Sequence, residues 1–393
     1  MMKHIVILGG GYGGLVSALA ARKLLSQEEA AITLVNQYKT HQIITELHRL
    51  AAGGLSERAI GLPLEKLIKG KGIELVIDKV AAIKPDQKQV TLQHNSKPLS
   101  YDLLVIALGS QTSFFQIPGL EEHSLTLKSA NEANQIRSHI LAKFDQYKLR
   151  RQPEDAAIVI GGGGLTGVEL VGELADRMPI WCKERGIQMG DISLYCIEAA
   201  PNILPGFESE LVDRARSSLT ARGVTFITGM HIAEYTGELV RLRDGREIPA
   251  STLVWTGGVK GNQLVADSGI ALERGRAQID PYLASVSHPD IFVAGDSAVF
   301  RNELDQPTPP SAQLASQMGD AIGYNLYATI RGLPLEAFRF KNSGKLVSLG
   351  RKDAIASVGA NNIALKGLPA SLMKEGSKAR YLAHINGLSA YMY

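Results

Sequence analysis

The first feature of the sequence that could support chemistry is a spacing of glycines that occurs twice. The copies, each after an apolar β-branched run, are Gly9, Gly11 and Gly14 and then Gly162, Gly164 and Gly167. In a Gly-x-Gly-x-x-Gly pattern the first glycine makes the tight turn out of a buried parallel strand. The second lets backbone approach a pyrophosphate, and the third lets the next helix pack on the strand. Two copies in this setting predict two dinucleotide sites.

Polar side chains end the strand that follows each glycine pattern. These are Asn36 after residues 31–35 and Glu198 after residues 192–197. An acid is usual here because it binds ribose hydroxyls, so Asn36 is a departure, although its amide can still hydrogen-bond a ribose. Glu198 accepts from a free 2′-hydroxyl and repels a 2′-phosphate, and no Arg lies in residues 199–202. The second site is therefore predicted to prefer NADH over NADPH.

A second acid ends a later strand, residues 290–296, at Gly295-Asp296. At the carboxyl end of a strand, Asp296 can hydrogen-bond the ribityl chain of a flavin. The alternative is an ordinary helix N-cap.

Three more polar side chains lie on expected helices. Glu169 falls in the first turn after the second pattern, where an acid can also simply complement the helix dipole. Gln313 and Gln317 are four apart and project from one helical face. Beside Ala312, Ala315 and Ser316, they can supply the neutral donors that a quinone carbonyl needs, or they are surface residues. His48 is expected to be a packed or surface histidine, not a proton donor.

The length of 393 residues fits two or three domains, and 45% hydrophobic with 21% charged residues is typical of a globular protein. Two cysteines, Cys182 and Cys196, cannot build a disulfide framework or a four-ligand metal site, and no metal is expected. The N-terminal apolar run is the first strand of the fold and not a cleavable leader, and no apolar stretch approaches the length of a membrane span.

The two patterns, with Ala107-Leu108-Gly109, Thr256-Gly257-Gly258 and Ala294-Gly295-Asp296, resemble the two-dinucleotide-binding-domain flavoproteins. Within them the chain is most similar to the type II NADH dehydrogenases. Residues 165–170 resemble that family's second loop, residues 312–317 its quinone-site motif, and the closing segment its C-terminal membrane-anchoring domain.

This resemblance implies an α/β fold with two Rossmann-like, glutathione-reductase-like domains and a C-terminal membrane-associating domain. The expected bounds are 1–115 with 265–330 for FAD, 116–264 for NADH, and 331–393 for the membrane. It implies non-electrogenic transfer of a hydride from NADH to non-covalent FAD, and of two electrons to a membrane quinone. A peripheral, monotopic position on the cytoplasmic face of the cell membrane follows, with no nucleic acid as partner. The oligomeric state, including a homodimer, and the quinone's identity stay open.

The resemblance also implies roles for individual residues. The expected FAD contacts are Gly9, Gly11, Tyr12, Gly13, Gly14, Leu15, Asn36, Lys39, Val80, Ala107, Gly109, Asp296, Gln313, Leu314 and Lys378. The expected NADH contacts are Gly162, Gly164, Leu165, Thr166, Gly167, Glu198 and Gly258. The expected quinone contacts are Ala312, Gln313, Ser316 and Gln317, and Glu169 and Gln317 are the expected catalytic residues.

The end of the chain is basic and amphipathic. Residues 341–393 carry eight Lys or Arg against two Asp or Glu, a balance of +6, while the other 340 residues balance at −3. Tyr381, Ile385, Leu388 and Met392 share one helical face, which Leu382, Tyr391 and Tyr393 widen, near Lys374, Lys378 and Arg380. We expect this helix to lie on anionic lipid; the alternative is that the stripe packs on the protein's own core.

Three other functions remain open at this stage. A sulfide:quinone oxidoreductase shares the fold but needs cysteines flanking the flavin, and neither Cys182 nor Cys196 is well placed. A soluble reductase of a ferredoxin or rubredoxin would not need the basic, aromatic tail. A non-catalytic redox sensor would keep both dinucleotide sites without a quinone pocket.

Overall fold

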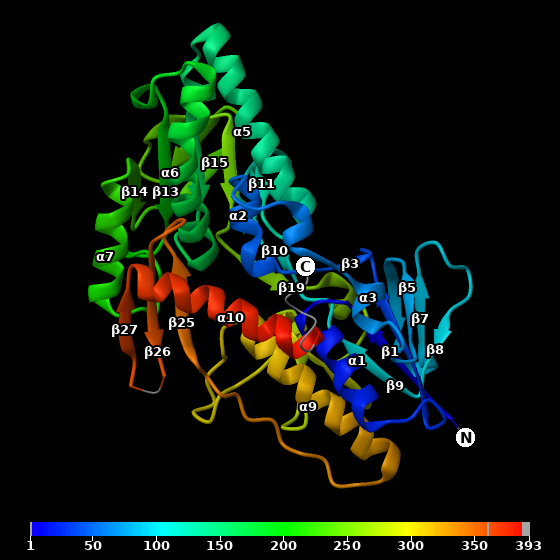
Figure 1. The fold of residues 1–393 in the computed structure, drawn as a ribbon. Helices are drawn as coiled ribbons and strands as arrows, with labels where there is room; N and C mark the ends of the chain where they lie inside the picture. The colour runs from blue at the N-terminus through cyan, green and yellow to red at the C-terminus, as the bar shows by residue number, and fades with distance from the viewer. Residues whose placement is uncertain (1, 360, 387–393) are drawn as a thin grey trace.

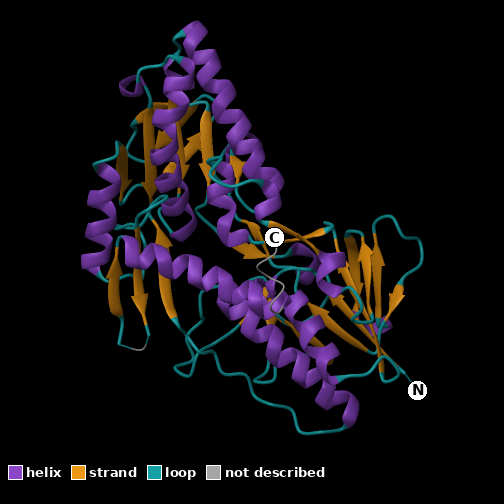
Figure 2. Ribbon diagram, viewed as in Figure 1, coloured by secondary structure: helices purple, strands orange, loops and turns teal. Residues whose placement is uncertain are grey.

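A computed structural model describes residues 2–359 and 361–386. In Figure 1 one parallel sheet with its helices lies at the upper left, in green, and another lies at the right, in blue. A small antiparallel sheet and the last long helix complete the molecule, and Figure 2 shows helices beside each sheet. The fold is the predicted mixed α/β fold built around two parallel sheets.

The first sheet has the strand order β22-β23-β9-β1-β2-β5 and is parallel from β23 to β5. Its strands are β1 (Lys3–Leu8), β2 (Ala30–Asn36), β5 (Ile73–Ile77), β9 (Leu103–Ile106), β22 (Ala284–Ser285) and β23 (His288–Val293). Because β22 and β23 come late in the chain, this sheet contains segments that lie on both sides of the second sheet in the sequence. Strand β5 is the edge strand of this sheet.

The second sheet has the order β11-β18-β12-β13-β14, and all its pairings are parallel. Its strands are β11 (Leu125–Thr126), β12 (Ala157–Gly161), β13 (Ser193–Glu198), β14 (Val224–Thr228) and β18 (Thr252–Trp255). Helix α6 (Leu165–Arg185) connects β12 to β13. Its 21 residues account for the long spacing from the second glycine pattern to Glu198.

Two strands mark where the chain passes between the sheets. β10 (Ser110–Thr112) is antiparallel to β19 (Val259–Gly261), with Ser110 opposite Gly261. The indole N–H of Trp255 donates to the carbonyl of Ser113 at 2.8 Å. The outgoing and returning segments therefore run side by side.

The remaining helices are α1 (Tyr12–Leu24), α2 (Leu47–Ala51), α3 (Leu64–Ile68), α4 (Leu120–His123), α5 (Ala130–Arg150), α7 (Ser209–Thr220), α8 (Gln263–Ala266), α9 (Ala312–Arg331) and α10 (Leu368–Asn386). Helix α5 begins with a complete capping box between Ser129 and Glu132. The excursion that was predicted near residues 90–92 is β6 (Val80–Lys84), β7 (Gln89–Leu92) and β8 (Leu99–Ser100).

Other short strands are β3 (Thr40–Gln42), β4 (Gly61–Pro63), β15 (Ile232–Tyr235), β16 (Leu239–Leu242), β17 (Glu247–Pro249), β20 (Leu272–Glu273), β21 (Arg276–Gln278) and β24 (Ala298–Val299). The predicted hairpin around Asp244-Gly245 is β16 with β17.

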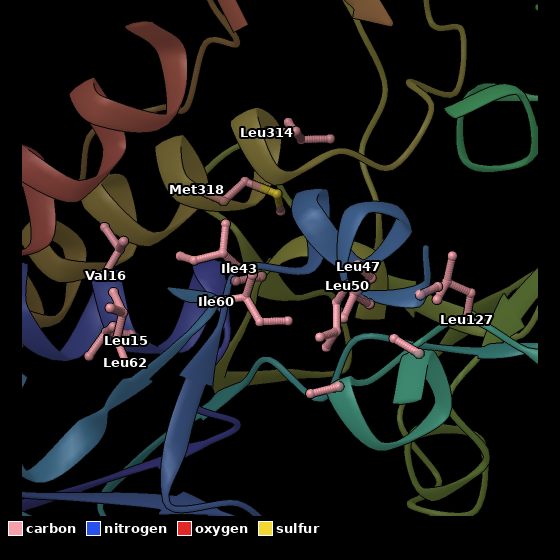
Figure 3. Close-up of a cluster of buried hydrophobic side chains, with 14 of the residues drawn as sticks. Leu15, Val16, Ile43, Leu47, Leu50, Ile60, Leu62, Leu127, Leu314 and Met318 are labelled. Carbon is pink, nitrogen blue, oxygen red and sulfur yellow. The ribbon is translucent and has the colours of Figure 1, made fainter. Parts of the chain in front are cut away.

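The core beside the first sheet is built where α1 meets α9. A Cβ on Gly319 or Gly323 of α9 would collide with α1, so these glycines allow the two helices to approach closely. Figure 3 shows Leu314 and Met318 of α9 above Val16 and Leu15 of α1. All four side chains are buried. This contact fixes the position of α9 relative to the first glycine pattern.

The C-terminal part is the antiparallel sheet β25 (Gly344–Ser348), β26 (Ala354–Val358) and β27 (Ile363–Lys366), followed by α10. The β25–β26 turn packs on α6, because a Cβ on Gly172 would collide with the backbone of Leu349. Both carboxylate oxygens of Asp353 accept from Arg214 at 3.1 Å. From this sheet α10 runs across the molecule to α9 and α1 (Figure 1).

Candidate active site

The first glycine pattern lies in the turn from β1 to α1. Gly9 has φ +102°, a left-handed conformation that favours glycine. A Cβ on Gly14 would collide with the carbonyl oxygen of Gly9, so the third glycine sets the contact between helix and strand. A Cβ on Gly11 would meet no atom within 4 Å. The backbone of Gly11, just before α1, therefore faces space that a phosphate group can enter.

The second pattern repeats this geometry between β12 and α6. Gly162 has φ +108°, and a Cβ on Gly167 would collide with the carbonyl of Gly162. Gly164 has open space within 4 Å, as Gly11 does. Leu165 and Thr166 begin α6 and are exposed beside that space. Both loops thus meet the steric requirements of a pyrophosphate at a helix N-terminus.

Asn36 and Glu198 act on these loops in the same way. Asn36 Oδ1 accepts from the N–H of Gly10 at 2.9 Å, and Glu198 Oε2 accepts from the N–H of Gly163 at 2.5 Å. Glu198 Oε1 also accepts from Ala200 N–H at 2.7 Å. The amide that replaces an acid at residue 36 therefore keeps the contact with its loop, while Glu198 brings a negative charge.

Asp296 lies in a 3₁₀ turn after β23 and is not the N-cap of a longer helix. Its Oδ2 accepts from the hydroxyl of Ser110 at 2.7 Å, and Lys128 Nζ lies 2.9 Å from the same hydroxyl. Burial lowers the pKa of Lys128. Ser110 and Lys128, which sequence reasoning missed, tie Asp296 to the segment that leads into the second sheet.

Gly13, Ala107 and Gly109, also expected at FAD, lie by the first loop or by the Gly295-Asp296 turn next to it. A Cβ on Gly13 would come 2.8 Å from the Cβ of Ala294, next to the Gly295-Asp296 turn. Ala107 contacts Gly9, and Gly109, with φ +70°, accepts from Ser297 Oγ at 3.2 Å. Leu15 and Val80 are buried, whereas Lys39 is exposed in the segment after β2.

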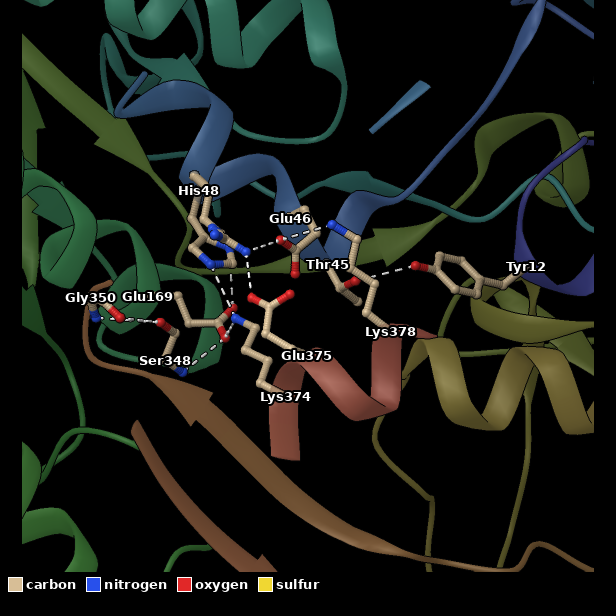
Figure 4. Close-up of polar contacts among 11 residues, drawn as sticks. Tyr12, Thr45, Glu46, His48, Glu169, Ser348, Gly350, Lys374, Glu375 and Lys378 are labelled. Carbon is tan, nitrogen blue, oxygen red and sulfur yellow. Dashed lines mark hydrogen bonds and ion pairs between the residues drawn. The ribbon is translucent and has the colours of Figure 1, made fainter. Parts of the chain in front are cut away.

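Glu169 lies at the centre of a charged cluster from three helices, α2, α6 and α10 (Figure 4). Its Oε1 accepts from Lys374 Nζ at 2.6 Å and from the N–H of Ser348 at 3.1 Å. Both Lys374 and Glu169 side chains are mostly shielded from solvent, at 13% and 14% exposure. Glu169 therefore does more than complement the helix dipole, because it binds the C-terminal helix through a shielded ion pair.

His48 lies between these two charges. Lys374 Nζ is 3.1 Å from His48 Nε2, and His48 Nδ1 is 3.5 Å from Glu169 Oε2. Because an ammonium only donates, Nε2 accepts and the imidazole proton lies on Nδ1, facing the carboxylate. Burial, with Lys374 and Arg49 nearby, lowers the pKa of His48 well below its ordinary value. His48 was expected to be a packed or surface histidine, and the structure shows it packed.

A second ion-pair chain extends the cluster. Arg49 Nη1 lies 2.9 Å from buried Glu46 and 2.7 Å from Glu375, and Lys378 Nζ lies 3.6 Å from Glu46. Lys378, expected at FAD, thus faces Glu46. Glu173, one turn after Glu169, is buried, and this burial raises its pKa to about 7.

The lipid-facing stripe expected on the last helix is contradicted where the structure describes it. Ile385 is 3% exposed, and the Tyr381 hydroxyl lies 2.9 Å from His41 Nε2, so both side chains pack inward. Lys374 and Lys378 pair with Glu169 and Glu46 and do not form a cationic edge. Helical periodicity identified the face correctly, but the core covers it. Leu388, Tyr391, Met392 and Tyr393 lie outside the described residues.

Three rings connect this helix to the first glycine loop. Tyr12 and Tyr381 have ring centroids 4.5 Å apart, and His41 lies 5.3 Å from Tyr12. His41 Nδ1 lies 2.9 Å from the carbonyl of Gly10. Burial lowers the pKa of His41 to about 4, so the imidazole is neutral; it donates to Gly10 and accepts from Tyr381. The C-terminal helix therefore reaches the loop expected to bind FAD.

Gln313 and Gln317 bond the same backbone group. Each side-chain N–H donates to the carbonyl of Lys341 at 3.0 Å, and Gln317 Oε1 accepts from Lys341 N–H at 2.9 Å. They are therefore adjacent, as predicted, and hold the segment that leads to β25. Ala312 begins α9, Leu314 is buried, and Ser316 Oγ is buried without a hydrogen-bond partner among the described residues.

Both cysteines are buried. Burial raises the pKa of Cys182, and that of Cys196 to about 12. Both thiols are free cysteines inside the protein, and neither is exposed to take up sulfide.

Comparison with known proteins agrees with this geometry. Residues 3–319 match the model of the pyridine nucleotide-disulphide oxidoreductases. The chain is 34% identical over 98% of its length to a type II NADH:quinone oxidoreductase of Staphylococcus aureus, covering 96% of that protein. It is 33% identical to the enzyme of the same name from Staphylococcus saprophyticus, with the same coverage. The chain belongs to the type II NADH:quinone oxidoreductases.

Solved structures share the fold of this type II oxidoreductase. NDH2 from Plasmodium falciparum in complex with NADH has a TM-score of 0.87 at 17% identity, with coverage of 100% of this chain and 99% of that one. The sulfide:quinone oxidoreductase of Aquifex aeolicus has a TM-score of 0.81 at 23% identity, covering 98% and 92%. This shared fold does not favour sulfide chemistry in this chain, whose two cysteines are both buried.

The type II oxidoreductase family uses FAD and NADH, and the residues of this chain fit both. Gly11 and Gly164 leave the space that a pyrophosphate needs at each loop. The chain is thus an FAD-dependent NADH:quinone oxidoreductase. Within the described residues no helix has the length and apolar character required to cross a bilayer.

Proposed function

We propose that NADH binds at the second glycine loop, FAD at the first, and the quinone near α9 and α10. Bound FAD would take a hydride from NADH and pass two electrons to the quinone. The observation that carries this assignment is the repeated loop geometry, with open space at Gly11 and Gly164. In this proposal residues 1–115 and 265–330 form the FAD domain, 116–264 the NADH domain and 331–393 the C-terminal domain.

Glu198 selects the nucleotide in this proposal. Its carboxylate, at the end of β13, meets the ribose and disfavours a 2′-phosphate. Gly258 and the exposed start of α6 complete the NADH contacts. At the first loop, Asn36 meets the ribose of FAD, and Asp296, held by Ser110, meets the ribityl chain.

Glu169 and Lys374 are proposed to hold and supply a proton for quinone reduction. Reduction of a quinone to a quinol consumes two electrons and two protons. The Lys374 ammonium, 2.6 Å from Glu169, can donate a proton, and the carboxylate stabilises the ammonium until it does. Neutral His48 keeps Lys374 in place because its Nε2 accepts from the ammonium.

Gln317, with Gln313, Ala312 and Ser316, is proposed to line the quinone end of the site. The buried, unpartnered hydroxyl of Ser316 supports this, since such a group ordinarily has a partner. If the quinone competes with Lys341 for the amide of Gln317, the N–H now bound to the Lys341 carbonyl becomes the donor to the quinone.

Membrane association is proposed through a different face of the C-terminal part than periodicity indicated. Ile363, Leu368 and Leu372 are 59%, 58% and 63% exposed, and the two leucines share one turn of α10. We name these three residues the Leu368 patch. Exposed apolar side chains on a surface helix can insert into the interface of a bilayer. The cytoplasmic face and a homodimer belong to the same proposal.

The test is co-sedimentation with vesicles combined with two activity assays. Leu368→Ser with Leu372→Ser should weaken vesicle binding and the oxidation of long-tailed quinones, while reduction of soluble dyes by NADH continues. A matched control is Leu149→Ser, since Leu149 is 83% exposed at the end of α5, far from this patch along the chain. Equal vesicle binding by all three proteins would reject the patch.

A further inference from the structure

One cavity in the structure borders Gln317, which is assigned to the quinone end above, but its other lining residues have no role in the cofactor or substrate assignments. It has a volume of about 450 Å³ and lies between α9, α10 and the segment of residues 334–343 that leads from α9 to β25. That segment follows α9 back across the molecule as the orange loop in Figure 1. We name the cavity the strap cavity and residues 334–343 the strap.

Hydrogen bonds hold the strap against α9 at two points. Asn325, which is fully buried, accepts from Glu336 N–H at 2.9 Å and donates to the Glu336 carbonyl at 3.0 Å. Gln317 makes the same pair of bonds to the backbone of Lys341. Two side-chain amides thus fix the backbone of the strap, so the cavity wall is a built feature of the fold.

The side chains of the strap separate onto two faces. Phe338 and Phe340 pack against Phe300, with ring centroids 5.0 and 6.5 Å apart. Arg339 and Lys341, which are two residues apart, line the cavity. This alternation is that of an extended chain, with one row of side chains toward the core and the other toward the cavity.

Three cations face the strap cavity. Arg380 of α10 lines it opposite Arg339 and Lys341, and all three residues are exposed. No described residue forms an ion pair with any of the three side chains. Two acids, Glu336 and Asp320, also line the cavity, and Asp320 pairs with His384 at 3.1 Å. Arg and Lys without partners around one hollow attract an anion, and a guanidinium suits the oxygens of a phosphate.

The walls of the strap cavity are also apolar. Ala321, Ala337 and the edge of Phe338 line it with the cations. An inorganic ion would leave these surfaces unused, whereas an amphiphile would bury a chain or glycerol group against them. From this combination we propose that the strap cavity binds the phosphate of an anionic phospholipid, with Arg339, Lys341 and Arg380 around the headgroup.

This site rests on the membrane association proposed above, but an experiment can reject the strap cavity without rejecting the Leu368 patch. The Leu368 patch would act on any bilayer, while the strap cavity acts only on anionic lipid. Loss of binding to neutral and anionic vesicles alike therefore concerns the patch. A loss confined to the extra binding that anionic lipid adds over neutral lipid is a defect of the strap cavity.

The first experiment compares vesicles of phosphatidylcholine with vesicles that also contain phosphatidylglycerol, using the full FAD-loaded chain. Arg339→Gln with Arg380→Gln should reduce the extra binding to phosphatidylglycerol about 20-fold, since each cation near an anionic surface contributes about fivefold. The control is Arg351→Gln with Lys352→Gln, two exposed cations of the same part without side-chain partners among the described residues. Equal losses from the two variants would overturn the site and leave only general surface charge.

The second experiment identifies the anion by titration calorimetry. Short-chain, soluble phosphatidylglycerol should bind the unaltered protein, and the Arg339 and Arg380 variant should lose that binding. Short-chain phosphatidylcholine should bind weakly. Inorganic phosphate that binds as tightly as the lipid would overturn the lipid assignment, and so would lipid binding that both variants retain.

Discussion

Asn36 and Glu198 occupy equivalent positions in the two halves of the molecule. Each ends the strand after its glycine loop, and each accepts the N–H of the residue that follows the first glycine, Gly10 or Gly163. The two positions differ in charge and not in this contact. The charge at residue 198 is therefore the feature that should discriminate between nucleotides.

Glu198→Gln should relax the preference for NADH over NADPH by about tenfold, mainly in KM, because a hydrogen bond to a charged acceptor is replaced by one to a neutral acceptor. The glutamine oxygen can still accept from Gly163. Steady-state kinetics with both nucleotides measures the change. Asn36→Asp is the matched control and should leave the preference unchanged; equal use of both nucleotides by the unaltered protein would contradict the role of Glu198.

Gly11→Ala and Gly14→Ala should fail in different ways. A methyl group at residue 11 meets no protein atom, so the fold should survive while FAD binding falls, because the methyl occupies the space of the pyrophosphate. At residue 14 it collides with Gly9, so the fold itself should be destabilised. Circular dichroism with flavin content after desalting separates the two. A Gly11→Ala protein that retains full flavin would remove the pyrophosphate from this loop.

Lys374→Met should destabilise the protein by about 3 kcal/mol, because it leaves the shielded Glu169 carboxylate without its cation. Reoxidation of the flavin by quinone should slow more than its reduction by NADH. Chemical denaturation and stopped-flow spectroscopy measure the two effects. Glu375→Gln, at a side chain 53% exposed, should cost less than about 1 kcal/mol. An equal slowing of both half-reactions by Lys374→Met would argue against a role in quinone reduction.

Glu173→Gln should stabilise the protein above neutral pH. Burial raises the pKa of Glu173 from 4.5 to about 7, so between these values the folded protein holds a proton that the unfolded chain has released. Stability therefore falls as pH rises through this window, by on the order of 3 kcal/mol. Melting temperatures of the two proteins should agree near pH 4 and diverge as the pH approaches 8. A difference that does not change with pH would show that Glu173 is not the titrating group.

The two glycine patterns in the sequence predicted the loops that are proposed to bind dinucleotides. In each loop the third glycine contacts the first, Gly14 with Gly9 and Gly167 with Gly162, within six residues of chain, so the sequence carries that geometry directly. The positions of Ala107, Asp296 and Gln317 in the fold could also be predicted, because each residue follows a recognisable strand or lies near the start of a helix. The long spacing from Gly164 to Glu198 left a helix and a loop both open, and the structure has the helix α6 there.

Contacts between distant segments could not be predicted in this way. Lys374 and Glu169 are 205 residues apart, and nothing local marks either one for the other. The spacing of Tyr381 and Ile385 identified one helical face, but an inward stripe and a lipid-facing stripe have the same period. Only the position of α10 over α1, with His41 between Tyr381 and Gly10, distinguishes them.

The central claim is that electrons pass from NADH through bound flavin to a quinone. Anaerobic stopped-flow mixing of the FAD-loaded protein tests it most directly, by following the visible absorption of the flavin in two steps. The account predicts that NADH bleaches this absorption faster than NADPH does, and that a soluble quinone analogue then restores it. A flavin that sulfide bleaches and NADH does not, or a reduced flavin that quinone fails to reoxidise, would contradict the account.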